Sequence, residues 1–274
     1  MFSIITALYK TDNYLAEYKN KLESFVAALK QENIPVEVVL VPREPSVFER
    51  SLINELTSHD WCREVSSESK GLYGAWNSGV SAAKGEILGF WNVDDFRYME
   101  GVKEGLDLIT QGADLVYFPF RIRRYLNLFG YSLLVHIQRI DSQVPEFNEQ
   151  TKTEFLRSML CGPFFIFKKS LYDRVGPFDE QFRSAADFDW CIRAAKIGQF
   201  KRGQKLGGSF RVDGKGISSG GKDFLTAENN TICLRHHIKD KIKTINPELM
   251  KPYDPANITY RGEKIVLNQN GLLK

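Results

Sequence analysis

The chain has 274 residues, of which 43% are hydrophobic and 12% aromatic, enough to bury the core of one large α/β domain or two small ones. Its 37 basic and 34 acidic residues give a formal net charge of +3, a balance that argues against nucleic acid as the main partner. The four cysteines are widely spaced and form no CxxC pair, so neither a zinc site nor a disulfide framework is indicated.

The N-terminal residues do not resemble a secretory leader. The segment from Phe2 to Leu8 reads as a short strand, and no apolar run in the sequence is long enough to span a bilayer. We therefore expect a cytoplasmic protein whose thiols are reduced and mostly buried.

Strands and helices alternate in the N-terminal third of the chain. Residues 2–8 and 36–41 are expected to form strands, and the second is nearly all β-branched, as in a parallel strand buried on both faces. Apolar residues at helical spacing predict a helix between them. Further helices are expected at 46–56 and 72–83, before a strand at 87–91. This alternation predicts a doubly wound, mainly parallel α/β sheet that binds ligands at the carboxyl ends of its strands.

The pattern becomes less regular in the second half. A helix is expected at 98–110 and a strand at 114–120. Residues 121–140 mix aromatic and basic side chains around Gly130, and they read either as a hairpin or as an amphipathic helix on a membrane surface; the lack of a clear period favours the hairpin. The remaining expected elements are a helix at 153–160, a strand at 164–167 and an amphipathic helix at 187–197.

The most informative motif is an apolar strand that ends in two adjacent acids. Residues 90–95 read FWNVDD. Neighbouring carboxylates repel each other, and such a pair at a strand end usually persists because a cation or a polyol ligand compensates it. An aspartate here can also simply cap a helix or stabilise a turn. Asp94 and Asp95 are therefore candidates for a ligand or metal site.

Two further motifs follow the acidic pair in order. Residues 176–182 read GPFDEQF, and residues 185–198 read AADFDWCIRAAKIG. Together with SKGLYGAWNSGVSAAKGEILGFWNVDD at 69–95, they resemble the family 2 inverting glycosyltransferases with the type A nucleotide-sugar fold, called GT-A. The order and spacing of the three motifs carry the resemblance, which covers about residues 2–215.

The resemblance also implies a domain organisation. A GT-A-like domain would be followed by an extension that contains a loop and helices, and glycines at the start of that extension suggest a loop able to close over a donor. The expected bounds are 1–215 for the domain, about 1–120 for its nucleotide-sugar half, 121–215 for its acceptor half, 216–274 for the extension and 214–221 for the glycine-containing loop.

Metal-dependent transfer is a further implication of the resemblance. A divalent cation, Mn²⁺ or Mg²⁺, held by hard carboxylate oxygens would neutralise charge on the departing diphosphate. Asp94 and Asp95 fit this role, and the sequence does not distinguish which binds metal and which binds sugar. Asn92 stands where the family commonly has an acid, and it can hydrogen-bond the donor. Asp213 stands where the family often has a histidine, which makes it a candidate third ligand.

An inverting reaction needs a general base opposite the leaving group. Asp187 matches the family's base by its position in AADFDW. The family usually has Glu just before this residue, whereas this chain has Ala186. Asp187 could equally be the N-cap of its helix, with Asp189 stabilising the helix dipole. The two roles are compatible, because a capping residue can also face a cleft.

The nucleotide-binding residues are less clearly marked. Glu44 follows the second strand, where the family usually has Asp, and it either contacts the base or forms a surface salt bridge with Arg43. Lys70 is placed to approach the diphosphate, although an exposed lysine is more often only solvated. After the first strand, the positions that correspond to nucleotide contacts in the family are Thr6, Ala7, Leu8 and Tyr9.

A basic run near the C-terminus has two interpretations. A solvated helix face is favoured, and the alternative is peripheral contact with an anionic membrane or with a polyprenyl-phosphate acceptor. The run consists of Arg235, His236, His237, Lys239, Lys241 and Lys243.

These observations predict an inverting glycosyltransferase. It would move a sugar from a nucleotide-diphosphate sugar to a hydroxyl of a glycan or lipid-linked glycan, in surface polysaccharide synthesis. A noncatalytic nucleotide-sugar binder or scaffold of a polysaccharide assembly complex is the alternative, supported by the departures at Asn92 and Ala186. A nucleotidyltransferase is disfavoured because the segment after the first strand, TALYKTDN, contains no glycine.

Overall fold

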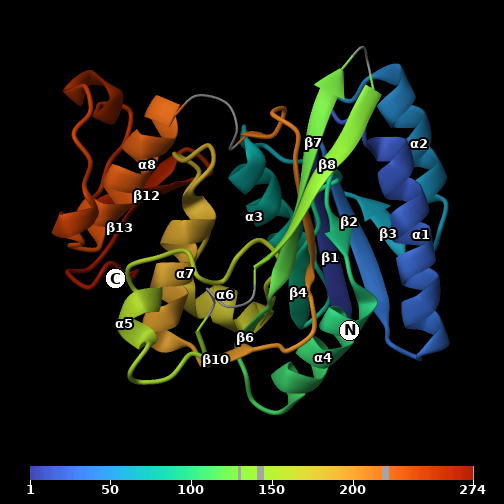
Figure 1. Cartoon of the computed structure of the whole chain (residues 1–274), viewed down its shortest axis with the longest axis horizontal. Helices are drawn as coiled ribbons and strands as arrows, with labels where there is room; N and C mark the ends of the chain where they lie inside the picture. The colour runs from blue at the N-terminus through green and yellow to red at the C-terminus, as the bar shows by residue number, and fades with distance from the viewer. Residues whose placement is uncertain (129–130, 141–144, 218–221, 274) are drawn as a thin grey trace.

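A computed structural model describes residues 1–128, 131–140, 145–217 and 222–273 of the chain. Its centre is a seven-stranded sheet with the order β10-β6-β9-β4-β1-β2-β3 (Figure 1). Strand β9 runs antiparallel to β4 and β6, and the other neighbouring strands are parallel. The strands are β1 (Phe2–Leu8), β2 (Val36–Pro42), β3 (Cys62–Glu64), β4 (Ile87–Phe90), β6 (Leu115–Tyr117), β9 (Ile166–Lys168) and β10 (Phe200–Arg202).

Helices cover both faces of this sheet, and neighbouring residues of one strand contribute to separate cores. Ile4 of β1 packs in a cluster with Leu22 and Val102, whereas Ile5 packs in a second cluster with Trp76 and Trp190. This period of two is what a strand buried on both faces requires. The first cluster includes α1 (Leu15–Gln31), α2 (Val47–Thr57) and α4 (Met99–Thr110), and the second includes α3 (Leu72–Ala82), α6 (Lys169–Val175) and α7 (Ala186–Ile197). The predicted doubly wound sheet is thus confirmed.

A second sheet contains a long hairpin. Its order is β5-β11-β7-β8, and β7 pairs with β8 in antiparallel register. The predicted hairpin is therefore confirmed, and the alternative of an amphipathic helix is wrong; Gly130 itself lies outside the described residues. The strands are β5 (Phe96–Arg97), β7 (Phe120–Leu128), β8 (Tyr131–Ile140) and β11 (Gly208–Val212).

The strand expected at 114–120 is divided between the two sheets. Strand β6 ends at Tyr117 in the central sheet, and β7 begins at Phe120 in the second sheet. Pro119 lies between them and has no N–H to donate to a neighbouring strand, so one continuous strand is disfavoured there. Strand β3, with only three residues, is too short to show a period in the sequence.

The C-terminal segment packs on the same core. Ile232 and Cys233 of α8 belong to the apolar cluster that contains Trp190. The predicted boundary at residue 215 stays a prediction, and residues 218–221 of the predicted loop lie outside the described residues. None of the helices in the described ranges is both long and apolar enough to cross a membrane. The remaining elements are α5 (Lys152–Phe155), α8 (Lys222–Arg235), η2 (Lys239–Lys241), η3 (Pro247–Met250), β12 (Asn257–Tyr260) and β13 (Glu263–Val266).

Candidate functional site

The loop after β4 holds the two adjacent carboxylates of Asp94 and Asp95. Its main chain is fixed by side chains from elsewhere in the fold. The Nζ of Lys21, on α1, donates to the carbonyls of Val93, at 3.3 Å, and Asp95, at 2.8 Å. The indole nitrogen of Trp91 donates to the Asp95 carbonyl at 3.2 Å. The loop is therefore held in place by bonds that do not use its carboxylates.

The carboxylates of this acidic loop carry excess negative charge. Asp95 is buried and accepts from the main-chain N–H of Arg211, at 2.9 Å, and from the amide of Asn92, at 3.4 Å. Burial raises the pKa of Asp95 well above its usual value, and the charge of Asp94 raises it further. The pKa of Asp94 is raised by burial and by the charge of Asp213. A bound cation would relieve this repulsion.

Asp213 forms an ion pair with Arg211 inside the protein, in contrast to Asp94 and Asp95. Its Oδ2 accepts from the hydroxyl of Tyr14, at 2.7 Å, and from Nε of Arg211, at 2.8 Å, while Oδ1 accepts from the Lys215 amide at 3.0 Å. Burial acts to raise the pKa of Asp213, but these hydrogen bonds outweigh it and leave the pKa below its usual value. The Arg211 guanidinium also lies 3.9 Å from the ring centre of Tyr125, so a residue of the hairpin completes this cluster.

The acidic loop offers two adjacent carboxylates to a metal ion, of which Asp95 also accepts hydrogen bonds from Arg211 and Asn92. In the described ranges, no group of three or more His, Cys, Asp or Glu side chains is arranged to hold a metal ion. Mg²⁺, however, commonly binds one or two carboxylates and completes its shell with substrate phosphates and water. Asp94 and Asp95 meet that requirement. Asp213 would have to exchange its bonds to Arg211 and Tyr14, and its predicted role as a ligand stays a prediction.

Asp187 lies in the first turn of α7, half-buried. Its Oδ1 accepts from the Tyr73 hydroxyl and from the Phe188 amide, each at 3.0 Å. Ala185, not Asp187, occupies the N-cap position of the helix, so the capping interpretation is wrong. Burial raises the pKa of Asp187 to about 6, against the lowering effect of the Tyr73 hydrogen bond. A carboxylate with this pKa can accept a proton near neutral pH.

Aromatic rings connect Asp187 to the strand that precedes the acidic loop. Tyr73 packs edge-on against Trp76, with ring centres 5.3 Å apart, and Trp76 stacks on Phe90 at 3.9 Å. Phe90 is the last residue of β4. The helix α3 thus supplies a rigid connection between the candidate base and the acidic loop.

The GPFDEQF motif has a positioning role. The side chain of Asn77, on α3, donates to the Phe178 carbonyl and to Glu180, each at 2.9 Å, and accepts from the Phe178 amide at 2.9 Å. Glu180 also accepts from Ser69 at 2.6 Å. The motif therefore ties the turn before α7 to the start of α3, the helix that carries Tyr73.

A second acidic cluster, beneath α7, consists of Asp179 and Asp189. Both form ion pairs with arginines. Asp189 accepts from Nε of Arg193 at 2.8 Å, and Nη1 of Arg235 lies 2.9 Å from its other oxygen. Nη2 of Arg235 lies 2.9 Å from Asp179. Burial opposes the charge of Asp189, but Arg235 and Arg193 outweigh it and hold its pKa well below the usual value. At Asp179, burial outweighs Arg235 and raises the pKa.

This cluster corrects both interpretations of the C-terminal basic run for Arg235 and His236. The side chains of Arg235 and His236 are 1% exposed, so neither forms a solvated face or contacts a membrane. Nε2 of His236 lies 2.9 Å from Asp189, and burial lowers the histidine pKa to about 4, which makes the imidazole neutral at pH 7. The remaining members of the run are exposed: His237, Lys239, Lys241 and Lys243.

The predicted nucleotide contacts have different surroundings. The Thr6 hydroxyl is fully buried between the Tyr18 hydroxyl, at 2.6 Å, and the Trp91 carbonyl, at 3.0 Å. This side chain is therefore occupied inside the protein and does not reach the site. Glu44 is exposed and lies 3.7 Å from Arg43, the salt bridge that was the alternative to a base contact. The other predicted contacts are half-buried Ala7 and Asn92 and exposed Tyr9 and Lys70.

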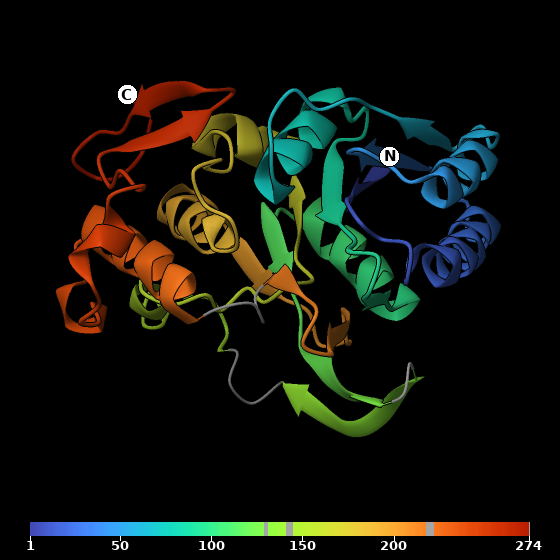
Figure 2. The ribbon, with the colours of Figure 1, turned by 90° about the horizontal axis from the view of Figure 1, so that it is seen from above.

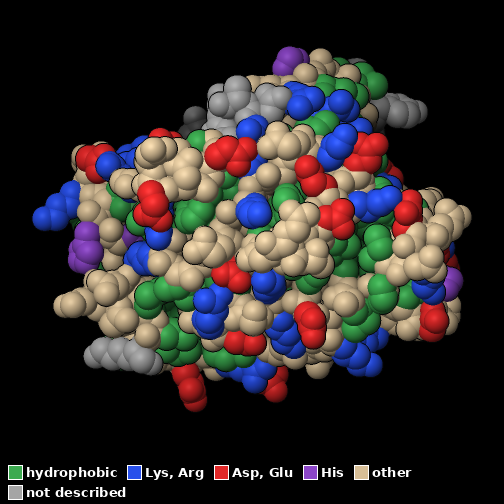
Figure 3. Space-filling model, turned by 90° about the horizontal axis from the view of Figure 1, so that it is seen from below, with side chains coloured by type: hydrophobic (Ala, Val, Ile, Leu, Met, Phe, Trp, Pro, Cys, Tyr) green, Lys and Arg blue, Asp and Glu red, His purple; other side chains and the backbone are tan. Residues whose placement is uncertain are grey.

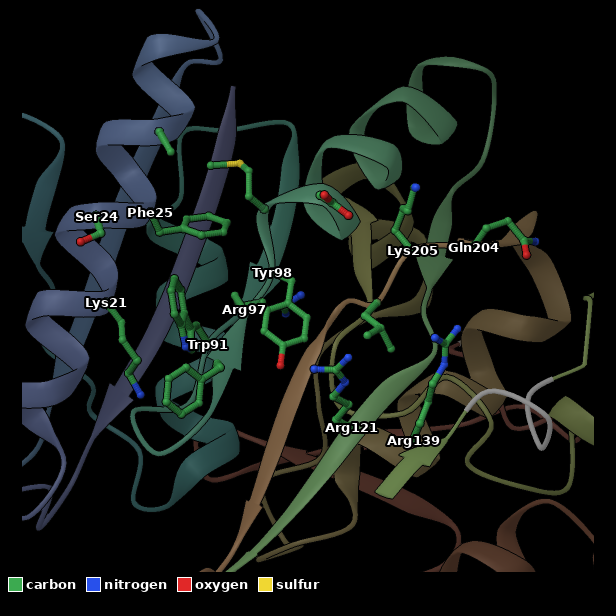
Figure 4. Close-up of a pocket in the computed structure, with 15 residues that line it drawn as sticks. Lys21, Ser24, Phe25, Trp91, Arg97, Tyr98, Arg121, Arg139, Gln204 and Lys205 are labelled. Atoms are coloured by element: carbon green, nitrogen blue, oxygen red, sulfur yellow. The ribbon is translucent and has the colours of Figure 1, made fainter. Parts of the chain in front are cut away.

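A cavity of about 810 Å³ lies between α1 and the hairpin (Figure 4). Its walls combine basic and aromatic side chains, and its lining includes Lys21, Arg121, Arg139, Lys205, Phe25 and Trp91. Trp91 precedes the acidic pair, but none of the predicted site residues lines the cavity. The cavity is therefore separate from the predicted donor contacts.

Sequence comparison finds related proteins. The profile described as Glycosyl transferase family 2 matches residues 3–176. The chain is 25% identical over 162 residues to chondroitin synthase of Escherichia coli, and the aligned region covers 57% of this chain and 22% of that protein. It is 24% identical over 207 residues to hyaluronan synthase of Pasteurella multocida, and this alignment covers 75% of this chain and 20% of that protein. The chain thus spans about a fifth of the length of these curated relatives.

Solved structures show the same fold. The structure of S. aureus TarS 1–349 in complex with UDP-GlcNAc matches with a TM-score of 0.63 at 17% identity, covering 90% of this chain and 69% of that one. The complex of the same protein with UDP matches with a TM-score of 0.60. The likeness confirms the GT-A-like architecture that the sequence predicts.

Proposed function

This chain belongs to glycosyl transferase family 2, and from that premise we propose that it is a metal-dependent inverting glycosyltransferase. It would transfer a sugar from a nucleotide-diphosphate sugar to a hydroxyl of a glycan or lipid-linked glycan. The names of the relatives, chondroitin and hyaluronan synthase, support a role in polysaccharide synthesis. The TarS complex with UDP-GlcNAc makes UDP-sugars the first donors to test. Four free, buried cysteines agree with a cytoplasmic location.

The observation that carries this proposal is the state of Asp187. Its pKa of about 6 leaves most of the carboxylate ionised at pH 7 while keeping it a stronger base than an ordinary aspartate. Tyr73 and the Phe188 amide both donate to Oδ1. Oδ2 is therefore the oxygen that we assign to the acceptor hydroxyl.

In the proposed reaction, the acceptor oxygen attacks the anomeric carbon from the face opposite the diphosphate. The hydroxyl proton passes to Oδ2 of Asp187 as the new C–O bond forms. The bond between the anomeric carbon and the diphosphate oxygen breaks, and its electron pair leaves with the diphosphate. One displacement inverts the configuration at the anomeric carbon.

Asp94 and Asp95 are the proposed ligands of a divalent cation, Mn²⁺ or Mg²⁺. When bound, the cation would neutralise charge that develops on the diphosphate. Asn92 donates to Asp95 at 3.4 Å and is placed to orient that carboxylate. Supporting contacts to the donor are proposed for Ala7 and Tyr9, with Glu44 and Lys70 at exposed positions in neighbouring loops.

The substitution Asp187→Asn tests the proposed base. It should lower kcat by about 10²–10⁴-fold, the usual contribution of general base catalysis, while calorimetry shows unchanged UDP binding in the presence of Mn²⁺. The control is Asp173→Asn, because Asp173 is exposed on α6. Wild-type turnover in the Asp187 variant would refute the assignment.

A noncatalytic binder is the second candidate. The departures from the family at Asn92 and Ala186 favour it. Transfer or donor hydrolysis measured with Mn²⁺ or Mg²⁺, with and without acceptor oligosaccharides, separates the two functions. Donor binding with no turnover under any of these conditions would support the binder.

A further inference from the structure

The hairpin β7/β8 projects from the body of the protein (Figure 2). It also concentrates exposed apolar side chains. Six large hydrophobic residues on it are between 44% and 58% exposed: Leu126, Leu128, Leu133, Leu134, Val135 and Ile137. On α2, by comparison, such residues are limited to Val47 and Phe48. Exposed apolar surface of this extent usually marks a contact with a partner or a membrane.

The apolar residues lie on both faces of the hairpin. Leu126 is paired with Leu133, and the next pair, Tyr125 with Leu134, points to the opposite face because successive strand residues alternate. The register shifts at Arg124/Tyr125, where Val135 has no partner opposite it. The face with Tyr125 is turned toward Arg211 and the candidate site. The face with Leu126 and Leu133 is therefore the one open to lipid.

Charge distinguishes the two ends of the hairpin. Four arginines lie toward its base, and residues 120–140 contain no Asp or Glu. Arg124 is exposed, whereas Arg121 and Arg139 line the cavity and Arg123 stacks on Phe96 at 4.2 Å. The projecting edge at the top of Figure 3 accordingly shows hydrophobic and basic side chains. An apolar tip with arginines behind it matches an anionic bilayer, in which acyl chains lie beneath phosphates.

We propose that the β7/β8 hairpin is a peripheral membrane contact that inserts its apolar tip into an anionic lipid surface. The apolar end of the hairpin also touches the candidate site, because Asn127, between Leu126 and Leu128, donates to the Asp213 carbonyl at 2.7 Å and Tyr125 lies against Arg211. Binding through the tip therefore holds the acidic loop close to the lipid surface. This inference concerns lipid binding and does not depend on sugar transfer.

Vesicle flotation tests the contact directly. The wild-type protein should float with vesicles of phosphatidylcholine and phosphatidylglycerol and not with phosphatidylcholine alone. The double variant Leu126→Ser/Leu133→Ser should lose at least about tenfold in bound fraction. Arg124→Gln should lose about fivefold at low salt. The control is Val47→Ser/Phe48→Ser, which removes the exposed apolar pair of α2 and should bind like wild type. Circular dichroism checks that each variant is folded.

An environment-sensitive label locates the inserted residue. All four native cysteines are buried, so a thiol-reactive NBD dye will label Leu133→Cys or, as the control, Val47→Cys. The Leu133→Cys label should brighten and shift to the blue on anionic vesicles, and the Val47→Cys label should not. Flotation unaffected by the leucine substitutions, or no flotation at all, would overturn the proposal. So would a dimer in light scattering that the leucine substitutions dissociate, because the patch would then be an interface between two copies.

Discussion

The acidic loop and the cluster beneath α7 place the same residue type in opposite electrostatic surroundings. Asp179 and Asp189 are buried with two arginines, so their formal charges cancel; the arginines hold the pKa of Asp189 well below its usual value, while burial still raises that of Asp179. Asp94 and Asp95 form no ion pair with a side-chain cation within the described residues. Burial raises the pKa of both, and the charge of Asp213 raises that of Asp94 further while the charge of Asp94 raises that of Asp95. The first arrangement needs nothing from outside the protein. The second is the one that we propose to bind a cation, because a positive charge would relieve its repulsion.

Among these predictions, we expect the largest effect on stability from a substitution of Arg235. Arg235→Met leaves Asp179 and Asp189 with one arginine between them, and removing one partner of a buried ion pair usually costs about 3–5 kcal/mol. Urea unfolding measures this loss. The control is Arg50→Met, because Arg50 pairs with Glu64 while it is 41% exposed, and exposed pairs contribute about 0–1 kcal/mol. Equal losses in the two variants would show that the buried cluster is not structural.

The sequence could not reveal this cluster. Arg235 is far from Asp179 and Asp189 in the chain, and the basic run around it has the composition of a solvated helix. The charge pattern of a helix identifies its polar residues but not which of them finds a buried partner in another element. The same limit applies to Thr6, whose hydroxyl belongs to the core although its position in the chain suggested a nucleotide contact.

Local periodicity, in contrast, predicted most of the fold. Strands β1 and β2 and helices α3 and α7 have their expected places, because buried strands and amphipathic helices repeat with their own periods. The acidic pair could be placed at a strand end for the same reason. Tyr73 was missed as the partner of Asp187, because α3 and α7 meet only in the folded chain.

Removing charge from the acidic loop should stabilise the folded protein, whereas the Arg235 substitution should destabilise it. The raised pKa of Asp94 means that its ionised form destabilises the folded protein, and this cost is fully present once the pH exceeds the folded-state pKa. In EDTA at pH 8, Asp94→Asn should therefore raise the free energy of unfolding.

The same variant tests the proposed metal site. Mn²⁺ with UDP should raise the melting temperature of the wild type, because a ligand that binds only the folded state stabilises it. Asp94→Asn should lose that increase. Destabilisation in EDTA combined with a retained response to Mn²⁺ would place Asp94 among the structural acids, with Asp189.

A shift in the pH dependence of kcat is expected at Tyr73. Asp187 must be ionised to act as a base, so wild-type kcat should rise as the pH increases through about 6. Tyr73→Phe removes a hydrogen bond to the charged carboxylate, worth about 1.5–3 kcal/mol. Since one pKa unit corresponds to about 1.4 kcal/mol, the midpoint should move up by about one to two units. Tyr73 would be only a packing residue if kcat fell equally at every pH from about 5 to 9, whereas recovery at high pH identifies it as the residue that tunes the base.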